Sequence, residues 1–159
     1  MSRQEISFKE RIEHNVNARI KTEQDIHHIK KCISGDYGAF VLSNTIDSFI
    51  PHEDDNASFR WRSQILLYTI ANCLVDIKAA DNITLSEIRN CLRFKRFVLL
   101  SDNELLSNSS IEMIDNYLTN LPGFNWSDSI EGDNPASNNF TYQAMLYFDL
   151  LDVLEDYLK

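Results

Sequence analysis

Apolar residues recur along this chain at intervals of three and four, the spacing of an α-helix with one buried face. The first such segment, 4–31, contains neither Gly nor Pro and carries a narrow apolar stripe. The stripe consists of Phe8, Ile12, Val16, Ile20, Ile26 and Ile29. We expect one charged amphipathic helix here. We therefore divide the chain into an N-terminal amphipathic helix, 1–32, and an all-alpha helical domain, 33–159.

Five further segments have helical spacing, and none shows the strict alternation of a half-buried strand. They are 37–50, 57–80, 85–97, 110–120 and 139–158. Segment 57–80 is apolar around much of its circumference, so we expect it to be the central core helix. Its inward positions would be Trp61, Ile65, Leu66, Tyr68, Thr69, Cys73, Leu74 and Ile77. The expected fold is all-α, a compact bundle of five to six helices.

Polar residues mark where two of these helices begin. Thr84 followed three residues later by Glu87 predicts a capping box, in which each side chain bonds the other's backbone amide. Ser34 or Asp36 is a candidate N-cap for the segment that starts at residue 37.

Charge is spread unevenly over the 159 residues, whose formal net charge is −9. Residues 1–31 hold seven basic against five acidic residues, and residues 32–100 hold seven against eight. Residues 101–159 hold one basic residue, Lys159, against eleven acidic ones. This acidic half disfavours non-specific DNA binding and suits a basic protein partner. A solvated face that keeps the domain soluble is the alternative interpretation.

The composition, 43% hydrophobic and 25% charged, is that of an ordinary globular domain. No apolar run is long enough to span a bilayer, and the N-terminus lacks the apolar core of a signal peptide. We expect a cytoplasmic protein without membrane insertion. Three cysteines with no CxxC pair argue against a disulfide framework. Cys73 and Cys91 are expected to be buried, whereas Cys32 is a candidate for exposure.

Catalytic and metal-binding signals are weak. His28 and Cys32 share a helix face, but no second ligand pair is evident. The acidic run 53–55 lacks the Gly and the spacing of a calcium loop. The acids of segment 139–158 have no partner motif, and there is no phosphate-binding loop or nucleophile elbow. We expect no metal, no cofactor and no enzyme activity, with a small hydrolase or metal enzyme held in reserve.

One basic cluster stands out from the acidic background. Arg89, Arg93 and Arg96 are spaced four and three apart, which would place them on one face of the helix 85–97, with Lys95 nearby. Such a face can contact DNA or an acidic partner. Salt bridges to acidic neighbours within the chain are the alternative.

Two motifs carry a family resemblance. YLTNLPGF, residues 117–124, is followed by TYQAMLYF, residues 141–148. Together with ILLYTIANCLVDI and DNITLSEIRNCLRFKRFVLL before them, they resemble the all-alpha domain of type IV secretion coupling proteins, the conjugative and Dot/Icm-type ATPases. The resemblance covers roughly 33–159. The Gln-His-Gly that the family usually has before its last Tyr is Asn139-Phe140-Thr141 here.

The resemblance implies a non-catalytic recognition module that recruits secretion substrates, a relaxase or other relaxosome components at the cytosolic face of the membrane. The alternative is a free-standing acidic helical adaptor or chaperone that dimerises or binds its partner through 1–31.

The LPGF motif leaves two roles open for its aromatic residues. Pro122 and Gly123 end the preceding helix, and residues 125–138 have the composition of a polar loop. Phe124 would turn back against the bundle with Trp126 covering its edge. Alternatively, Phe124 and Trp126 form an exposed hot spot for a partner.

Overall fold

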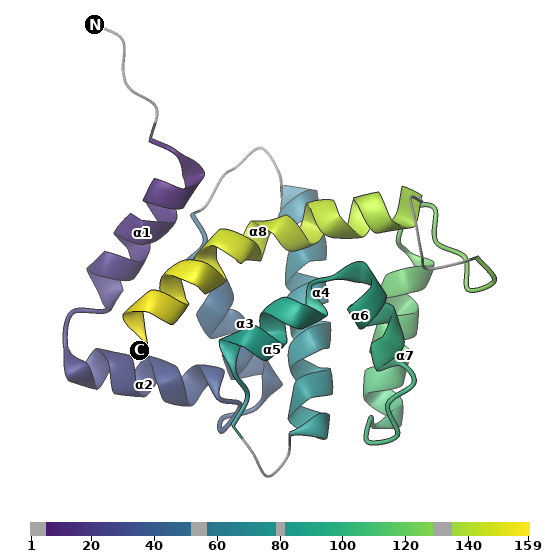
Figure 1. Cartoon of the computed structure of the whole chain (residues 1–159), viewed down its shortest axis with the longest axis horizontal. Coiled ribbons are helices and arrows are strands. Elements are labelled where there is room, and N and C mark those ends of the chain that lie inside the picture. Colours follow the sequence, from purple (N-terminus) through teal and green to yellow (C-terminus); the bar gives the residue numbers. More distant parts are fainter. Residues whose placement is uncertain (1–5, 52–56, 79–81, 129–134) are drawn as a thin grey trace, which may run out of the picture.

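The computed structural model describes residues 6–51, 57–78, 82–128 and 135–159, and these residues form eight α-helices and no strand (Figure 1). The helices are α1 (Phe8–Arg19), α2 (Glu23–Ile33), α3 (Ala39–Asp47), α4 (Ala57–Ile77), α5 (Leu85–Cys91), α6 (Phe94–Leu100), α7 (Asn108–Thr119) and α8 (Pro135–Tyr157). The predicted all-α class is confirmed. The predicted number of five to six helices is too low, because two of the predicted helices are each split in two.

Helix α4 is the centre of the bundle, as predicted. It packs against α3, α5, α7 and α8. In Figure 1, α8 crosses in front of α4, while α3 and α7 lie on either side of it. Helix α1 packs on α8, and α2 packs on α3. One side of α4, which carries Trp61, Ile65 and Tyr68, is exposed.

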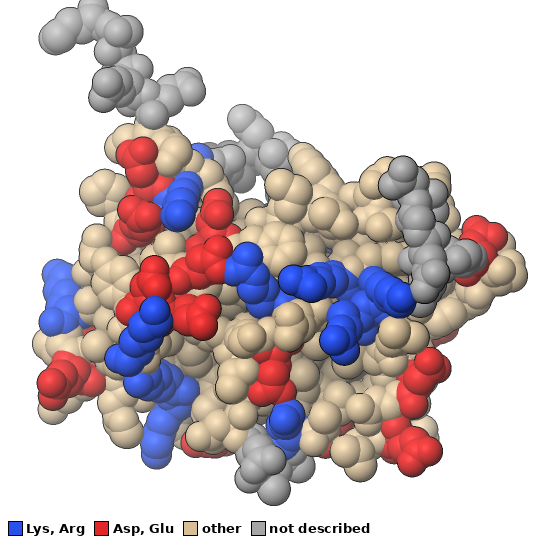
Figure 2. Space-filling view, viewed as in Figure 1, with Lys and Arg blue, Asp and Glu red and all other residues tan. Residues whose placement is uncertain are grey.

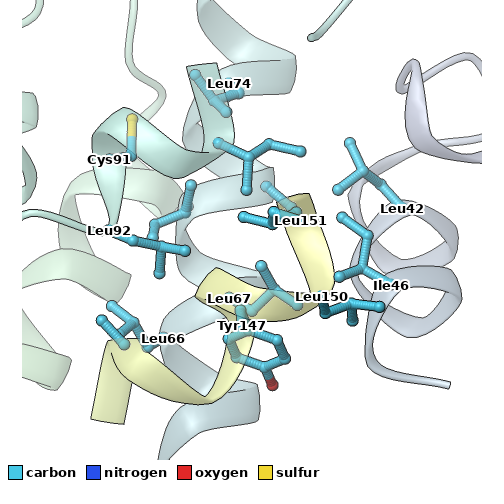
Figure 3. Packing of buried hydrophobic residues seen from close by; sticks show 14 of the residues in the cluster. Leu42, Ile46, Leu66, Leu67, Leu74, Cys91, Leu92, Tyr147, Leu150 and Leu151 are labelled. Atoms are coloured by element: carbon cyan, nitrogen blue, oxygen red, sulfur yellow. The ribbon is translucent and has the colours of Figure 1, made fainter. Parts of the chain in front are cut away.

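The core is a single cluster of buried side chains to which every helix contributes. Figure 3 shows leucines of α4 and α8, together with Leu92 at the end of α5, packed near Leu42 and Ile46 of α3. Tyr147 of α8 is also fully buried in this cluster. Each such leucine or isoleucine contributes about 1.5–3 kcal/mol through its removal from water. Ile12 and Val16 of α1 are fully buried members of the same cluster.

The predicted single helix over 4–31 is wrong. Helix α1 ends at Arg19 and α2 begins at Glu23, because Thr22 and Asp25 form a capping box that starts a new helix. In a continuous helix, Ile20 and Ile29 would be two and a half turns apart and would face opposite sides. The break allows both side chains to be buried. The sequence-based boundary between 1–32 and 33–159 falls inside α2.

The predicted helix over 85–97 is also wrong, since it ends at Cys91 and a second helix starts at Phe94. Leu92 and Phe94 are both buried, at 1% and 6% exposure. Two residues correspond to 200° on a continuous helix, so one of the two side chains would point to solvent. The break at Arg93 brings both inward. The capping box of Thr84 and Glu87 is confirmed.

Several predicted ends are shifted. Helix α3 starts after Gly38, which provides no side-chain cap, so neither Ser34 nor Asp36 caps it. Helix α8 begins at Pro135, which shortens the loop predicted over 125–138. Proline is common at the start of a helix, because the first turn has no partner for the missing N–H. All three cysteines are buried, including Cys32.

Candidate partner-binding surface

The three arginines predicted to share one helix face come from two helices. Arg89 lies on α5, Arg93 is the N-cap residue of α6 and Arg96 lies within α6. Arg89 forms an ion pair with Asp152 of α8, and its guanidinium carbon is 5.4 Å from the centroid of the Phe148 ring. Arg89 is therefore held within the fold. Arg93 and Arg96 are exposed and have no ion pair within the described part of the chain.

These side chains form part of a wider basic surface. Figure 2 shows Lys and Arg side chains in a band over α5, α6 and α8, with acidic side chains beside it toward α1 and the C-terminal end of α8. Lys95 is also exposed on α6. A band of one sign produces a local potential that attracts groups of opposite charge.

Phe124 has a structural role, as the first of the two interpretations predicts. Its ring packs edge-on against Phe94, with 6.3 Å between centroids, and against Trp126, at 5.1 Å. Its backbone N–H donates to the carbonyl of Leu121 at 3.1 Å, which closes the turn after α7. Trp126 donates from Nε1 to Asp115 Oδ1 at 3.0 Å but remains 47% exposed.

Another exposed apolar surface of the described residues lies on α4 and α3. Trp61, Ile65 and Tyr68 are spaced four and three apart and are 64%, 37% and 37% exposed. Phe40 of α3 is 65% exposed and meets Tyr68 edge-on, with 6.3 Å between ring centroids. We call these four residues the apolar ridge. The prediction that Trp61, Ile65 and Tyr68 point into the core is wrong.

A groove of about 460 Å³ runs along one side of the ridge, between α4 and α7. Its apolar walls come from Trp61, Ile65, Met113 and Leu121, and its polar lining includes Arg62, Thr69, Asn116, Tyr117, Asn120 and Gln143.

Two buried polar side chains form the floor of this groove. Tyr117 donates its hydroxyl hydrogen to Gln143 Oε1. Burial raises the pKa of Tyr117, against the smaller opposing effect of the Arg62 cation. Gln143 is only 5% exposed, yet its amide nitrogen makes no hydrogen bond within the described residues. This nitrogen is not fully enclosed, so it can donate to a ligand in the groove.

A second groove, of about 390 Å³, runs on the other side of the ridge, between α3 and α4. Its polar end is a rigid junction around Asp47, which accepts hydrogen bonds from Arg60 at 3.2 Å, Gln64 at 2.8 Å and the Tyr147 hydroxyl at 2.9 Å. These bonds tie α3 to α4 and α8. The carboxylate of Asp47 is therefore already paired, and the apolar walls of this groove come from Phe40, Trp61, Ile65, Leu67 and Tyr68.

The candidate metal ligands do not assemble into a site in the described residues. Cys32 Sγ lies 3.7 Å from His28 Nε2, but no group of three or more His, Cys, Asp or Glu gathers anywhere in the described ranges. The acidic run 53–55 and its neighbour His52 lie outside the described residues. On α8, Asp152 pairs with Arg89 and Asp156 with Lys159.

Comparison with protein-family profiles, with curated proteins and with solved structures found no match. Among the described helices, none is both long enough and apolar enough to cross a membrane.

The apolar ridge was missed because α4 is apolar on nearly every side. Such a helix is normally buried all round, and its apolar pattern does not show which side stays open. One pair of residues in the sequence does point to this surface. Trp61 and Arg62 stand side by side, and a large aromatic next to an arginine is typical of interface hot spots.

Proposed function

We propose that this chain is a recognition module that binds protein partners and has no chemistry of its own. The apolar ridge carries this proposal, since four large apolar side chains lie exposed between two grooves. Contiguous exposed apolar patches on soluble domains mark interaction sites. Aromatic anchors of this kind supply most of the energy of many interfaces.

The resemblance to coupling proteins suggests the class of partner. By analogy, the module recruits a secretion substrate, a relaxase or another component of a transfer system, in the cytoplasm and at the cytosolic face of the inner membrane. In this chain the LPGF motif connects α7 to α8. Phe124 closes the turn after α7, and Asn139 donates to the carbonyl of Pro122 at 2.9 Å, which ties that turn to α8.

A second candidate function is contact with DNA or another anionic partner. Arg93 and Arg96 favour it, because both are exposed and neither has an ion pair in the described part of the chain. Charge reversal of both should then abolish DNA binding in a mobility-shift measurement at low salt. Unchanged binding would remove this face from consideration.

The main test is an affinity pull-down with the full chain as bait, in which mass spectrometry identifies the bound proteins. We expect transfer-system components to be captured by the parent and lost with the double variant Trp61→Ser and Tyr68→Ser. Leu105→Ser is the matched control, because Leu105 is 64% exposed but lies away from the ridge. Capture that the ridge variant leaves intact would refute the proposal, as would capture of unrelated proteins alone.

A further inference from the structure

We infer that the groove between α4 and α7 binds an amphipathic helix of the partner, and that this helix brings a carboxylate to Arg62. The inference rests on the proposed function and specifies the partner's chemistry. It is carried by the dimensions of the groove, by its unpaired donors and by the Arg62 charge at one of its ends.

The groove has the length of two helical turns. Helices α4 and α7 are antiparallel, because Asp76 near the end of α4 accepts hydrogen bonds from Ser107 and Ser110 at the start of α7. The lining runs from Trp61 to Thr69 on one wall and from residue 113 to 121 on the other. Eight residues of helix span about 12 Å. A guest helix of that length presents apolar side chains at i, i+4 and i+7, which is the pattern of helix-in-groove recognition.

The polar groups of the groove call for an acceptor. Arg62 is exposed at the rim and has no partner within the described ranges. The Gln143 amide nitrogen lies at the floor and is also unpaired there. An arginine and an amide N–H both donate, so a carboxylate with its two acceptor oxygens satisfies them best. The apolar walls would exclude water from this contact and strengthen it.

Arg62 lies at the end of the groove where α7 finishes, because α4 and α7 are antiparallel. The carboxylate of the guest helix therefore belongs at that end. A charge contact of this kind helps to fix the register of the bound helix and to select partners.

The test uses two synthetic 16-residue helical peptides of alanine-rich sequence. Each has Leu at three positions spaced four and three apart. One carries Glu one turn before the first Leu, and the other carries Lys there. The protein is the full chain with Trp126→Phe, which leaves Trp61 as the only tryptophan. Trp61 fluorescence and the NMR signals of the Gln143 side-chain amide report binding.

We expect the Glu peptide to bind with shifts at both reporters, and the Lys peptide to bind about tenfold more weakly. Arg62→Glu should reverse this order. Lys30→Glu is the matched control: Lys30 is exposed on α2, and the substitution changes the net charge equally. It should leave both affinities unchanged.

Equal affinities for the two peptides, or shifts that miss Gln143, would overturn the inference. Self-association of the protein that Trp61→Ser abolishes and neither peptide displaces would instead assign the groove to a second copy. The two proposals can fail separately. If the ridge variant loses transfer-system proteins while the peptides show no charge preference, only the inference fails. If the charge preference holds but no such proteins are captured, only the proposed function fails.

Discussion

Asp76 shows how one side chain fixes the geometry of the candidate site. Its carboxylate accepts from the backbone N–H of Ser107 at 2.9 Å and from the Ser110 hydroxyl at 2.5 Å. Asn72 donates to the same Ser110 hydroxyl at 2.9 Å. These bonds hold the start of α7 against the end of α4, beyond the groove-lining residues Thr69 and Met113.

The pKa of Asp76 is lowered, because these hydrogen bonds to the charged form outweigh the opposing effect of burial. A lowered pKa means that the stabilisation is present above the unfolded pKa, near 3.9, and is lost as the pH falls through the folded pKa. We expect Asp76→Asn to reduce the free energy of unfolding by about 1–2 kcal/mol at neutral pH. The deficit should shrink as the parent carboxylate is protonated.

Urea unfolding of parent and variant at neutral pH and at about pH 2.5 measures this difference. The exposed Asp36 provides a control, since Asp36→Asn removes a carboxylate that lies outside this network. A deficit for Asp76→Asn that is equal at both pH values would show that the charged carboxylate is not the stabilising species.

At the residue scale, the sequence predicts buried positions well when a helix has one apolar face. In the segment 85–97, the apolar residues Ile88, Leu92 and Phe97 are at most 1% exposed. Apolar spacing does not distinguish buried from exposed positions on α4, where Leu66 is fully buried and Trp61 is 64% exposed. Only the positions of α3, α5, α7 and α8 decide which of them is covered, and that is tertiary information.

At the scale of the helix, the two breaks show what a local signal can reveal. Thr84 with Glu87 and Thr22 with Asp25 are equivalent capping boxes. The box of Thr84 and Glu87 follows a turn, so the sequence around it already indicates a helix start. The box of Thr22 and Asp25 lies inside a segment free of Gly and Pro, where the apolar stripe continues across it. The break at Arg93 has no capping side chain, so only the burial of Phe94 reveals it.

Gly123 is an element-scale requirement of the turn between α7 and α8. Its φ is +84°, and a Cβ built there would lie 2.7 Å from Pro135 Cβ and 3.2 Å from the backbone N of Ala136. Any side chain therefore meets the start of α8 in addition to the strain of positive φ. We expect Gly123→Ala to lower the free energy of unfolding by about 2–4 kcal/mol.

Gly123→Asn separates the two effects in the same unfolding measurement. Asparagine tolerates positive φ better than alanine does, but it carries the same Cβ. If the contact with Pro135 dominates, the asparagine variant should be nearly as unstable as the alanine variant. An asparagine variant close to the parent in stability would show that backbone strain is the only cost.

At the scale of the whole molecule, α1 and α2 are integral to the fold. Ile12 and Val16 of α1 are fully buried, and α1 packs on α8 near the C-terminus. The Tyr157 hydroxyl also donates to Asn17 Oδ1. The apolar stripe of the N-terminal segment is therefore occupied within the chain, whereas the apolar ridge on α3 and α4 stays exposed. Residue spacing predicts the stripe, but it does not reveal which surface covers it.

This arrangement predicts that a cavity in α1 destabilises the whole bundle. Ile12→Ala should reduce the free energy of unfolding by about 2–4 kcal/mol, because Ile12 is 0% exposed. Ile6→Ala is the control, since Ile6 is 51% exposed and its loss should cost less than about 0.5 kcal/mol.

Trp61 lies on α4 and Trp126 beyond α7, so tryptophan fluorescence reports on structure outside α1. If the bundle unfolds as one unit, the urea midpoint from fluorescence should fall with Ile12→Ala as far as the midpoint from circular dichroism. A fluorescence midpoint that stays at the parent value would mean that α1 detaches alone and that the bundle is stable without it.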